Sequence, residues 1–189
     1  MKPRDIPNLI TGLRILLVPP IVLLLIADRF GAALVLFILA GVSDVVDGFL
    51  ARAFNWKSRL GGWLDPIADK SLQISVYLTL AWLGLIPAWL MVAVILRDLV
   101  IVTGGAIYYF RIERVDAEPS WLSKINTLFQ ILLVMLVLYG QAVPGEVPEW
   151  LLSTMFLGVL FTTVVSGVDY VWNWSRRAAR TRRERDAAG

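Results

Sequence analysis

Long apolar runs separated by short polar segments make up most of this 189-residue chain. About 20 helical residues cross the hydrocarbon core of a bilayer, and six runs approach that length. The pattern therefore predicts an all-α, polytopic membrane protein with six transmembrane helices. We expect the spans at about 8–27, 31–53, 65–85, 88–110, 121–143 and 150–174.

Four polar segments connect most of the expected spans. A turn at 28–30, a basic loop at 55–62, a polar connection at 111–120 and an acidic loop at 144–149 interrupt the apolar runs. Pro66 directly follows Asp65. Because a helix tolerates proline best in its first turn, we expect the third span to start near Asp65, with this carboxylate as its cap.

The composition agrees with a membrane protein. Hydrophobic residues make up 58 % of the chain, which has eight tryptophans and a mean hydropathy of +0.70, values typical of polytopic membrane proteins. We expect one membrane domain at 1–175 and a basic tail at 176–189. Cysteine and histidine are absent, so thiol chemistry is excluded and a general base must be a carboxylate, a lysine or a tyrosine.

The positive charges predict the orientation. With the amino terminus inside, nearly all of the 18 Lys and Arg residues fall on the cytoplasmic side, where such residues concentrate in membrane proteins. Both termini are then cytoplasmic. Six arginines near the carboxy terminus favour contact with anionic membrane lipids over nucleic acid. The start of the chain does not resemble a cleaved signal, and we expect a bacterial inner-membrane protein.

Four aspartates stand out in this apolar chain. Asp44 and Asp47 are three residues apart, and Asp65 and Asp69 are four apart, so each pair projects from one face of a helix. A cluster of unpaired carboxylates would repel itself at the membrane edge. Oxygen ligands without His or Cys favour Mg²⁺, Mn²⁺ or Ca²⁺ over Zn²⁺. The sequence therefore predicts one or two divalent ions here, at the cytoplasmic face.

A divalent-cation transporter is an alternative of another class, since intramembrane carboxylates also line ion pathways. A transporter requires acidic residues along the whole route across the bilayer. These aspartates gather at one face, and the outer halves of the spans are apolar, so the pattern favours a surface site.

The complete pattern, D44-x2-D47-G48-x2-A51-R52-x8-G61-x3-D65-x3-D69, resembles the signature of the CDP-alcohol phosphatidyltransferase family. The resemblance implies six transmembrane helices, a homodimer, a site with two Mg²⁺ or Mn²⁺ ions, and transfer of a phosphatidyl group from CDP-diacylglycerol to an alcohol with release of CMP. It also implies metal-binding roles for all four aspartates, with Asp69 as the catalytic base. The donor-binding residues that it implies are Gly48, Ala51, Arg52 and Gly61.

The acceptor alcohol is indicated by a finer resemblance. Phrases such as NLITGLR at 8–14 and LIPAWL at 85–90 are similar to the CMP-forming cardiolipin synthases, whose acceptor is phosphatidylglycerol. Relatives that use glycerol 3-phosphate usually show Gly-Lys-x-Lys-Thr where this chain has Ser-Lys-Ile-Asn-Thr at 123–127. One cation fewer fits a phosphate diester better than a monoester, although glycerol 3-phosphate stays open as an alternative.

Polar residues inside the later spans are candidates for the acceptor pocket. Arg97, Lys124 and Asn126 are the residues that we expect to bind the acceptor phosphate, with Arg97 and Lys124 as cations. The alternative is structural, because Arg97 and Asp98 are adjacent and an internal ion pair would serve packing alone.

Overall fold

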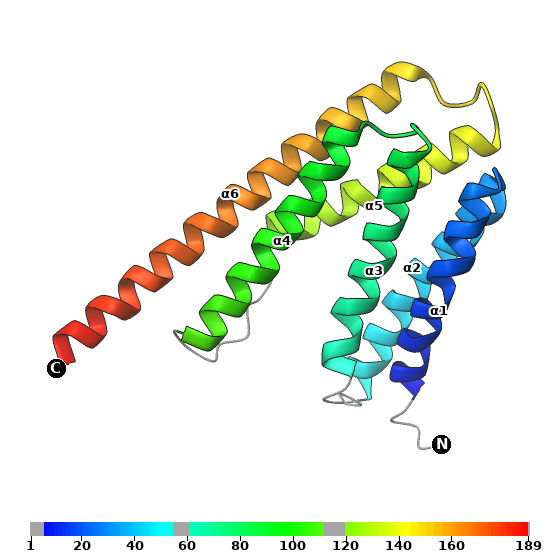
Figure 1. Ribbon diagram of the computed structural model, residues 1–189. Coiled ribbons are helices and arrows are strands. Elements are labelled where there is room, and N and C mark those ends of the chain that lie inside the picture. The colour runs from blue at the N-terminus through cyan, green and yellow to red at the C-terminus, as the bar shows by residue number, and fades with distance from the viewer. Residues whose placement is uncertain (1–5, 55–60, 112–119, 189) are drawn as a thin grey trace. The chain divides into compact units, whose positions relative to one another are not determined.

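The structure is a computed structural model that describes residues 6–54, 61–111 and 120–188. Side chains are described within these ranges except at 6–8, 50–52, 61–67, 69, 105–111 and 173–188. The described residues form six α-helices (Figure 1), which confirms the all-α prediction. They are α1 (Ile6–Ile26), α2 (Phe30–Ala53), α3 (Gly61–Trp82), α4 (Ala88–Arg111), α5 (Trp121–Ala142) and α6 (Glu149–Ala188).

Two helices differ from the expected spans. α3 begins at Gly61, one turn before the expected start, so Asp65 is not its cap. Pro66 then lies in the second turn, where its missing N–H removes a single backbone hydrogen bond. α6 continues to Ala188, so the arginine-rich segment prolongs the last helix. The predicted division into a domain at 1–175 and a tail at 176–189 stays a prediction.

The chain forms two compact units, of which unit 1 comprises residues 1–87 and 134–148. In it α1 packs against both α2 and α3. The core of this unit is apolar: Ile21 and Leu25 of α1 are fully buried, as are Ala33 and Ala40 of α2. These small residues of α2 let the helices approach closely, which is how helices associate in lipid.

Left-handed residues end α1 and α3. Asp28, with φ of 55°, follows α1; its N–H donates to the carbonyl of Leu25, and the N–H of Arg29 donates to that of Leu24. Gly84, with φ of 72°, closes α3 in the same way. Both are Schellman motifs, which satisfy the last carbonyls of a helix and reverse the chain within a few residues.

The end of α5 belongs to unit 1. Its contact with the start of α2 shows which helix ends lie together in this unit. A Cβ placed on Gly31, at the start of α2, would lie 3.7 Å from the Cβ of Ala142. The turn after α1 and the end of α5 are therefore neighbours. Figure 1 shows the amino terminus of α1, the end of α2 and the start of α3 at the opposite end of this unit.

Unit 2 comprises residues 88–133 and 149–189, and in it α4 packs along α6. Leu90 and Val94 of α4, Leu133 of α5 and Val159 of α6 are buried. Gly158 brings α6 close to α5, because a Cβ at that position would approach the ring of Phe129 to 3.3 Å. Small residues again permit close helix packing.

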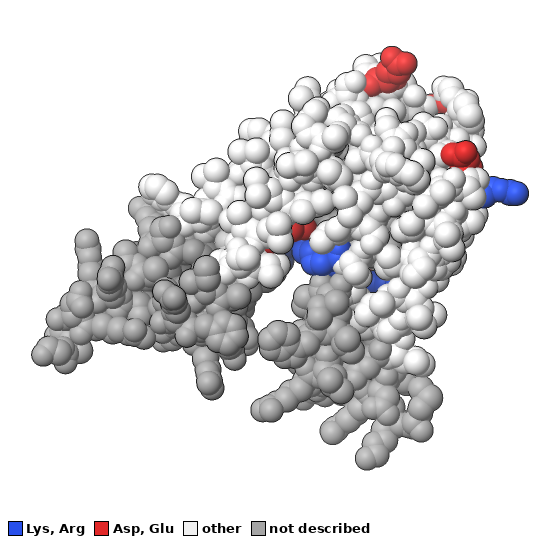
Figure 2. Space-filling model, viewed as in Figure 1, with Lys and Arg blue, Asp and Glu red and all other residues white. Residues whose placement is uncertain are grey.

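Four helices are long and apolar enough to cross a membrane, at Leu9–Ile26, Phe30–Phe49, Trp121–Ala142 and Glu149–Trp172. Large apolar side chains are exposed along them, and uncharged surface covers most of the described part in Figure 2. Exposed apolar surface on this scale fits contact with lipid. The chain is therefore a polytopic, integral membrane protein. Described side chains cover only parts of α3 and α4, so six spans remain a prediction.

Candidate metal centre and membrane-embedded polar network

The backbone of unit 1 places the two aspartate pairs at matching depths. Asp47 lies six residues before the end of α2 and Asp65 four residues after the start of α3, which corresponds to about 9 Å and 6 Å along the helix axes. Asp44 and Asp69 lie about 14 Å and 12 Å from the same ends. Because α2 ends where α3 begins, the four positions share one end of the unit (Figure 1).

Asp44 and Asp47 converge on one arginine of α1. Nη1 of Arg14 lies 2.7 Å from Oδ1 of Asp44, and Nη2 of Arg14 lies 2.8 Å from Oδ2 of Asp47. The side chain of Arg14 is 1 % exposed and that of Asp47 is 5 % exposed, whereas that of Asp44 is 45 % exposed. Thr11, one turn before Arg14, donates a hydrogen bond of 3.3 Å to Oδ2 of Asp47. The arginine thus lies on the buried side of the pair, and Asp44 is partly exposed.

This donor set fits a hard divalent cation. Asp44 and Asp47 lie one turn apart on α2 and supply oxygen donors only, which suits such a cation, and each uses one oxygen for Arg14. Among the described side chains, no group of three or more acidic residues gathers around a common point. The side chains of Asp65 and Asp69 lie outside those described, so the four-carboxylate site and the role of Asp69 stay predictions.

Arg14 is the residue that sequence reasoning missed. Its position in an apolar run gave a signal, because an ionisable residue inside a membrane helix is costly and calls for a partner. Thr11 and Arg14 are also three residues apart, so they share a helix face. The sequence alone gave no sign that this face of α1 meets the aspartates of α2.

The expected donor-binding residues are described only in part. Gly48 follows Asp47 directly within α2. The side chains of Ala51 and Arg52 and the surroundings of Gly61 lie outside the described residues, so their predicted contact with the CDP moiety is not tested.

In unit 2, Arg97 of α4 forms the centre of a buried polar network. Its Nη1 donates to Oδ1 of Asp98 at 2.8 Å, and its Nη2 donates to Oγ of Ser123 at 2.7 Å and to Oγ of Ser166 at 2.6 Å. Arg97 is 6 % exposed and Asp98 is 3 % exposed. The guanidinium therefore joins α4, α5 and α6, and it pairs with Asp98 as the structural alternative predicted.

Asn126 of α5 forms a second polar contact with α6. Its Oδ1 accepts hydrogen bonds from Oγ1 of Thr162 at 3.0 Å and from Oγ1 of Thr163 at 2.9 Å. Asn126 is fully buried, and its Nδ2 has no hydrogen-bond partner among the described residues. A hydrogen-bonded asparagine in a membrane helix contributes to helix association.

Lys124 lies on a different face of α5 from Ser123 and Asn126. It is exposed, and its Nζ stands 5.4 Å from the ring centroid of Trp121, within range of a cation–π interaction. The structure therefore brings Arg97 to Ser123 and Asn126 to α6, but it does not bring Lys124 into either group.

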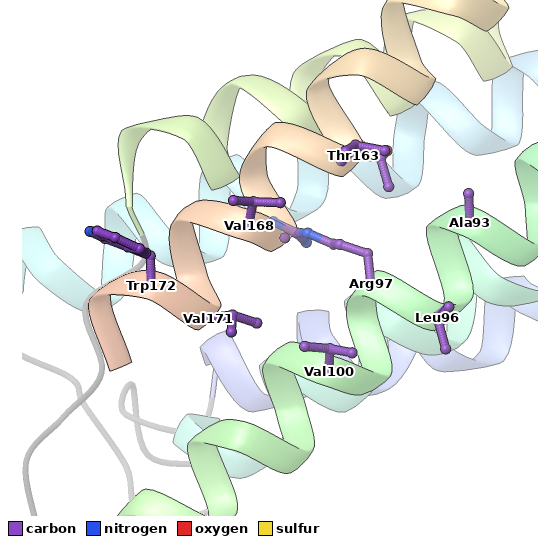
Figure 3. A pocket seen from close by; sticks show the side chains of 10 residues that line it. Ala93, Leu96, Arg97, Val100, Thr163, Val168, Val171 and Trp172 are labelled. Carbon is purple, nitrogen blue, oxygen red and sulfur yellow. The ribbon is translucent and has the colours of Figure 1, made fainter. Parts of the chain in front are cut away.

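A groove of about 470 Å³ runs between α4 and α6 within unit 2 (Figure 3). Apart from Arg97 and Thr163, its lining is apolar. Figure 3 shows Arg97 reaching from α4 across the groove toward α6. The apolar lining consists of Ala93, Leu96, Val100, Val164, Gly167, Val168, Val171 and Trp172.

Comparison with known proteins decides the family. Residues 4–165 match the sequence profile of the CDP-alcohol phosphatidyltransferases, a range that includes α1–α5, both aspartate pairs and the Arg97 network except Ser166. The chain belongs to the CDP-alcohol phosphatidyltransferase family. The family expected from the aspartate pattern is thus confirmed.

Members of the family with different named activities are similar to this chain. It is 33 % identical to the CMP-forming cardiolipin synthase of Rattus norvegicus over an alignment of 197 positions, gaps included, which covers 95 % of the chain and 64 % of that protein. It is 34 % identical to the CDP-diacylglycerol–glycerol-3-phosphate 3-phosphatidyltransferase of Bacillus subtilis over an alignment of 187 positions, which covers 90 % of the chain and 95 % of that protein. The chain thus spans less than two thirds of the cardiolipin synthase.

Proposed function

We propose that this protein transfers the phosphatidyl group of CDP-diacylglycerol to phosphatidylglycerol, forming cardiolipin and CMP. The observation that carries the proposal is the convergence of Asp44 and Asp47 within the family's complete four-aspartate pattern. A liponucleotide brings a pyrophosphate, whose negative charge requires cations, and carboxylates at the membrane surface are suited to hold them.

The proposed reaction is one substitution at phosphorus. Asp69 accepts the proton of the acceptor hydroxyl, whose oxygen attacks the phosphorus that bears the diacylglycerol. The bond from this phosphorus to the bridging oxygen breaks, and CMP leaves with the electron pair. Asp44, Asp47, Asp65 and Asp69 would hold the divalent ions, which would supply charge neutralisation and polarise the phosphorus when bound. Gly48, Ala51, Arg52 and Gly61 bind the CDP moiety.

The groove of unit 2 has apolar walls that suit an acyl chain. Both the proposed donor and a lipid acceptor carry acyl chains, so the groove fits a lipid substrate without selecting the acceptor. Arg97 is the cation of this groove, although three hydrogen bonds already hold its guanidinium. Lys124 and Asn126 stay predicted acceptor contacts, and the burial of Asn126 between α5 and α6 also supports a packing role.

Glycerol 3-phosphate is the second candidate acceptor. The similarity to the Bacillus subtilis protein extends over 95 % of that protein, a fuller match than with the rat cardiolipin synthase. The name of that relative includes glycerol 3-phosphate. The identities of 34 % and 33 % are too close to separate the two acceptors.

An acceptor comparison tests the proposal. Purified full-length protein receives CDP-diacylglycerol, Mg²⁺ and either phosphatidylglycerol or glycerol 3-phosphate, and CMP release is followed. We expect release with phosphatidylglycerol and none after chelation of the metal. Preference for glycerol 3-phosphate would replace the acceptor, and cation flux into liposomes without nucleotide would favour a transporter.

The same proposal includes the membrane location, the lipid contact of α6 and the oligomeric state. The active site faces the cytoplasm of a bacterial inner membrane, the arginine-rich end of α6 lies against anionic lipids, and the protein acts as a homodimer. Mass measurement of the detergent-solubilised protein tests the dimer.

A further inference from the structure

Arg14 has a place in unit 1 that the family pattern of aspartates does not include. It comes from α1, a helix outside the pattern, and yet it contacts the first two aspartates. At 1 % exposure its side chain is among the largest that are fully buried in the described part of the chain. A buried guanidinium has a high desolvation cost, so its position requires compensating charge.

The guanidinium of Arg14 contacts two carboxylates at once, through two different nitrogens. One terminal nitrogen of Arg14 bonds to each carboxylate, so a single planar group fixes the separation and the direction of both. The two aspartates are one helical turn apart and would otherwise repel each other. Thr11 adds a hydrogen bond to the oxygen of Asp47 that Arg14 also contacts. The two carboxylates are therefore held from one side by α1.

We propose that Arg14 is a positioning residue of the metal centre. Its guanidinium holds the carboxylates of Asp44 and Asp47 close together before a metal ion binds. This inference rests on the proposed function, since it takes the aspartates as metal ligands. Groups behind metal ligands orient them, and losing one such group typically costs about 10- to 100-fold in metal affinity.

Replacing Arg14 by lysine separates the effect of side-chain geometry on metal affinity from the effect of positive charge. An Arg14→Lys variant keeps the positive charge, so the repulsion that a metal ion meets is unchanged. A lysine ammonium cannot present two fixed nitrogens to two carboxylates in the way that a planar guanidinium does. Lower metal affinity in this variant therefore reports lost geometry alone.

The test measures Mn²⁺ binding to the detergent-solubilised full-length protein, using the electron paramagnetic resonance signal of free Mn²⁺. We expect Arg14→Lys and Arg14→Gln to bind Mn²⁺ about tenfold or more weakly. The matched control is Arg29→Lys, at the exposed turn between α1 and α2, and its affinity should equal that of the parent. A thermal transition recorded without metal shows that each variant is folded.

Three outcomes would overturn the inference. Unchanged affinity in both Arg14 variants means that Arg14 serves packing alone. Parent-like affinity in Arg14→Lys alone means that its charge matters and its geometry does not. Higher affinity in Arg14→Gln means that Arg14 competes with the metal.

A milder variant keeps the test decisive if the Arg14 variants do not fold. Thr11→Val leaves the guanidinium in place and removes the hydrogen bond to Asp47, so we expect Mn²⁺ affinity to fall about threefold. Unchanged affinity would count against the inference. Acceptor-dependent CMP release by the parent protein decides the proposed function separately, because the role of Arg14 is judged only from ratios of Mn²⁺ affinity.

Discussion

At the scale of residues, the buried charges among the described residues are held in ion pairs. Arg14 bridges two aspartates of α2, and Arg97 is paired with Asp98 and bonded to two serines. The two arginines differ in the partners that balance their charge. Arg97 has its counter-ion next to it in the chain, whereas Arg14 shares two carboxylates that the family pattern assigns to metal.

The roles that we propose for the aspartates give the first prediction. Asp69→Asn should lower the rate of CMP release by about 100-fold or more, because the acceptor hydroxyl would lose its proposed base. Mn²⁺ binding should survive in part, since Asp44, Asp47 and Asp65 are the principal proposed ligands. Asp44→Asn should weaken Mn²⁺ binding itself, as one converging ligand is lost.

Both variants are compared by CMP release and by the resonance signal of free Mn²⁺. Equal loss of Mn²⁺ affinity in the two would contradict the division between ligand and base. Glu146→Gln, in the exposed loop before α6, is the control and should match the parent in both measurements.

At the scale of elements, the turns set the order of the helices. A left-handed aspartate follows α1, and a left-handed glycine follows α3. The turn at Asp28 is short, which keeps α1 beside α2, and α1 also packs against α3. The contact between Arg14 and the aspartates of α2 depends on that packing.

A second prediction concerns the end of α3. Gly84→Ala should lower the free energy of unfolding by about 1–2 kcal/mol, because a Cβ is unfavourable at a positive φ. A Cβ there would meet nothing within 4 Å, so backbone strain is the whole expected effect. Thermal unfolding in detergent measures the loss.

Gly12→Ala is the matched control for this prediction. A Cβ at Gly12 also meets nothing within 4 Å, and the residue lies inside α1. Alanine favours a helix over glycine, so this variant should be as stable as the parent or slightly more stable. Equal destabilisation by both substitutions would show that the turn conformation is not the cause.

At the scale of the whole molecule, the charges and the helix order point to one orientation. In the sequence, positive residues gather before α1 and between α2 and α3. The start of α1, the end of α2 and the start of α3 lie at one end of unit 1, as do the aspartate positions (Figure 1). The start of α2 and the end of α5 lie at the other end. This arrangement agrees with an aspartate site that opens toward the cytoplasm.

Cysteine labelling tests the orientation, and the native chain has no cysteine to interfere. Single cysteines at Arg29 and Glu146 should react with a membrane-impermeant maleimide applied to the outside of sealed, right-side-out vesicles. A cysteine at Lys57 should react only after the vesicles are opened. The reverse pattern would place the aspartates on the outer face.

The sequence by itself determined the helices and the family. Apolar runs of membrane-spanning length predicted each helix, and eight specified residues from Asp44 to Asp69 identified the phosphatidyltransferases. Both are local properties of the chain. The start of α3 was misplaced because Pro66 favours a helix that begins just before it, whereas the helix begins one turn earlier, at Gly61, in spite of the cost of an interior proline.

Only the tertiary structure decided which charged groups meet. Arg14 precedes Asp47 by 33 residues, and Arg97 is 69 residues from Ser166. Such pairs depend on which faces of two helices pack together, and hydrophobic periodicity is weak in helices that are apolar on all sides. Lys124 and Asn126 show the same limit, because two residues along α5 separate an exposed lysine from a buried asparagine.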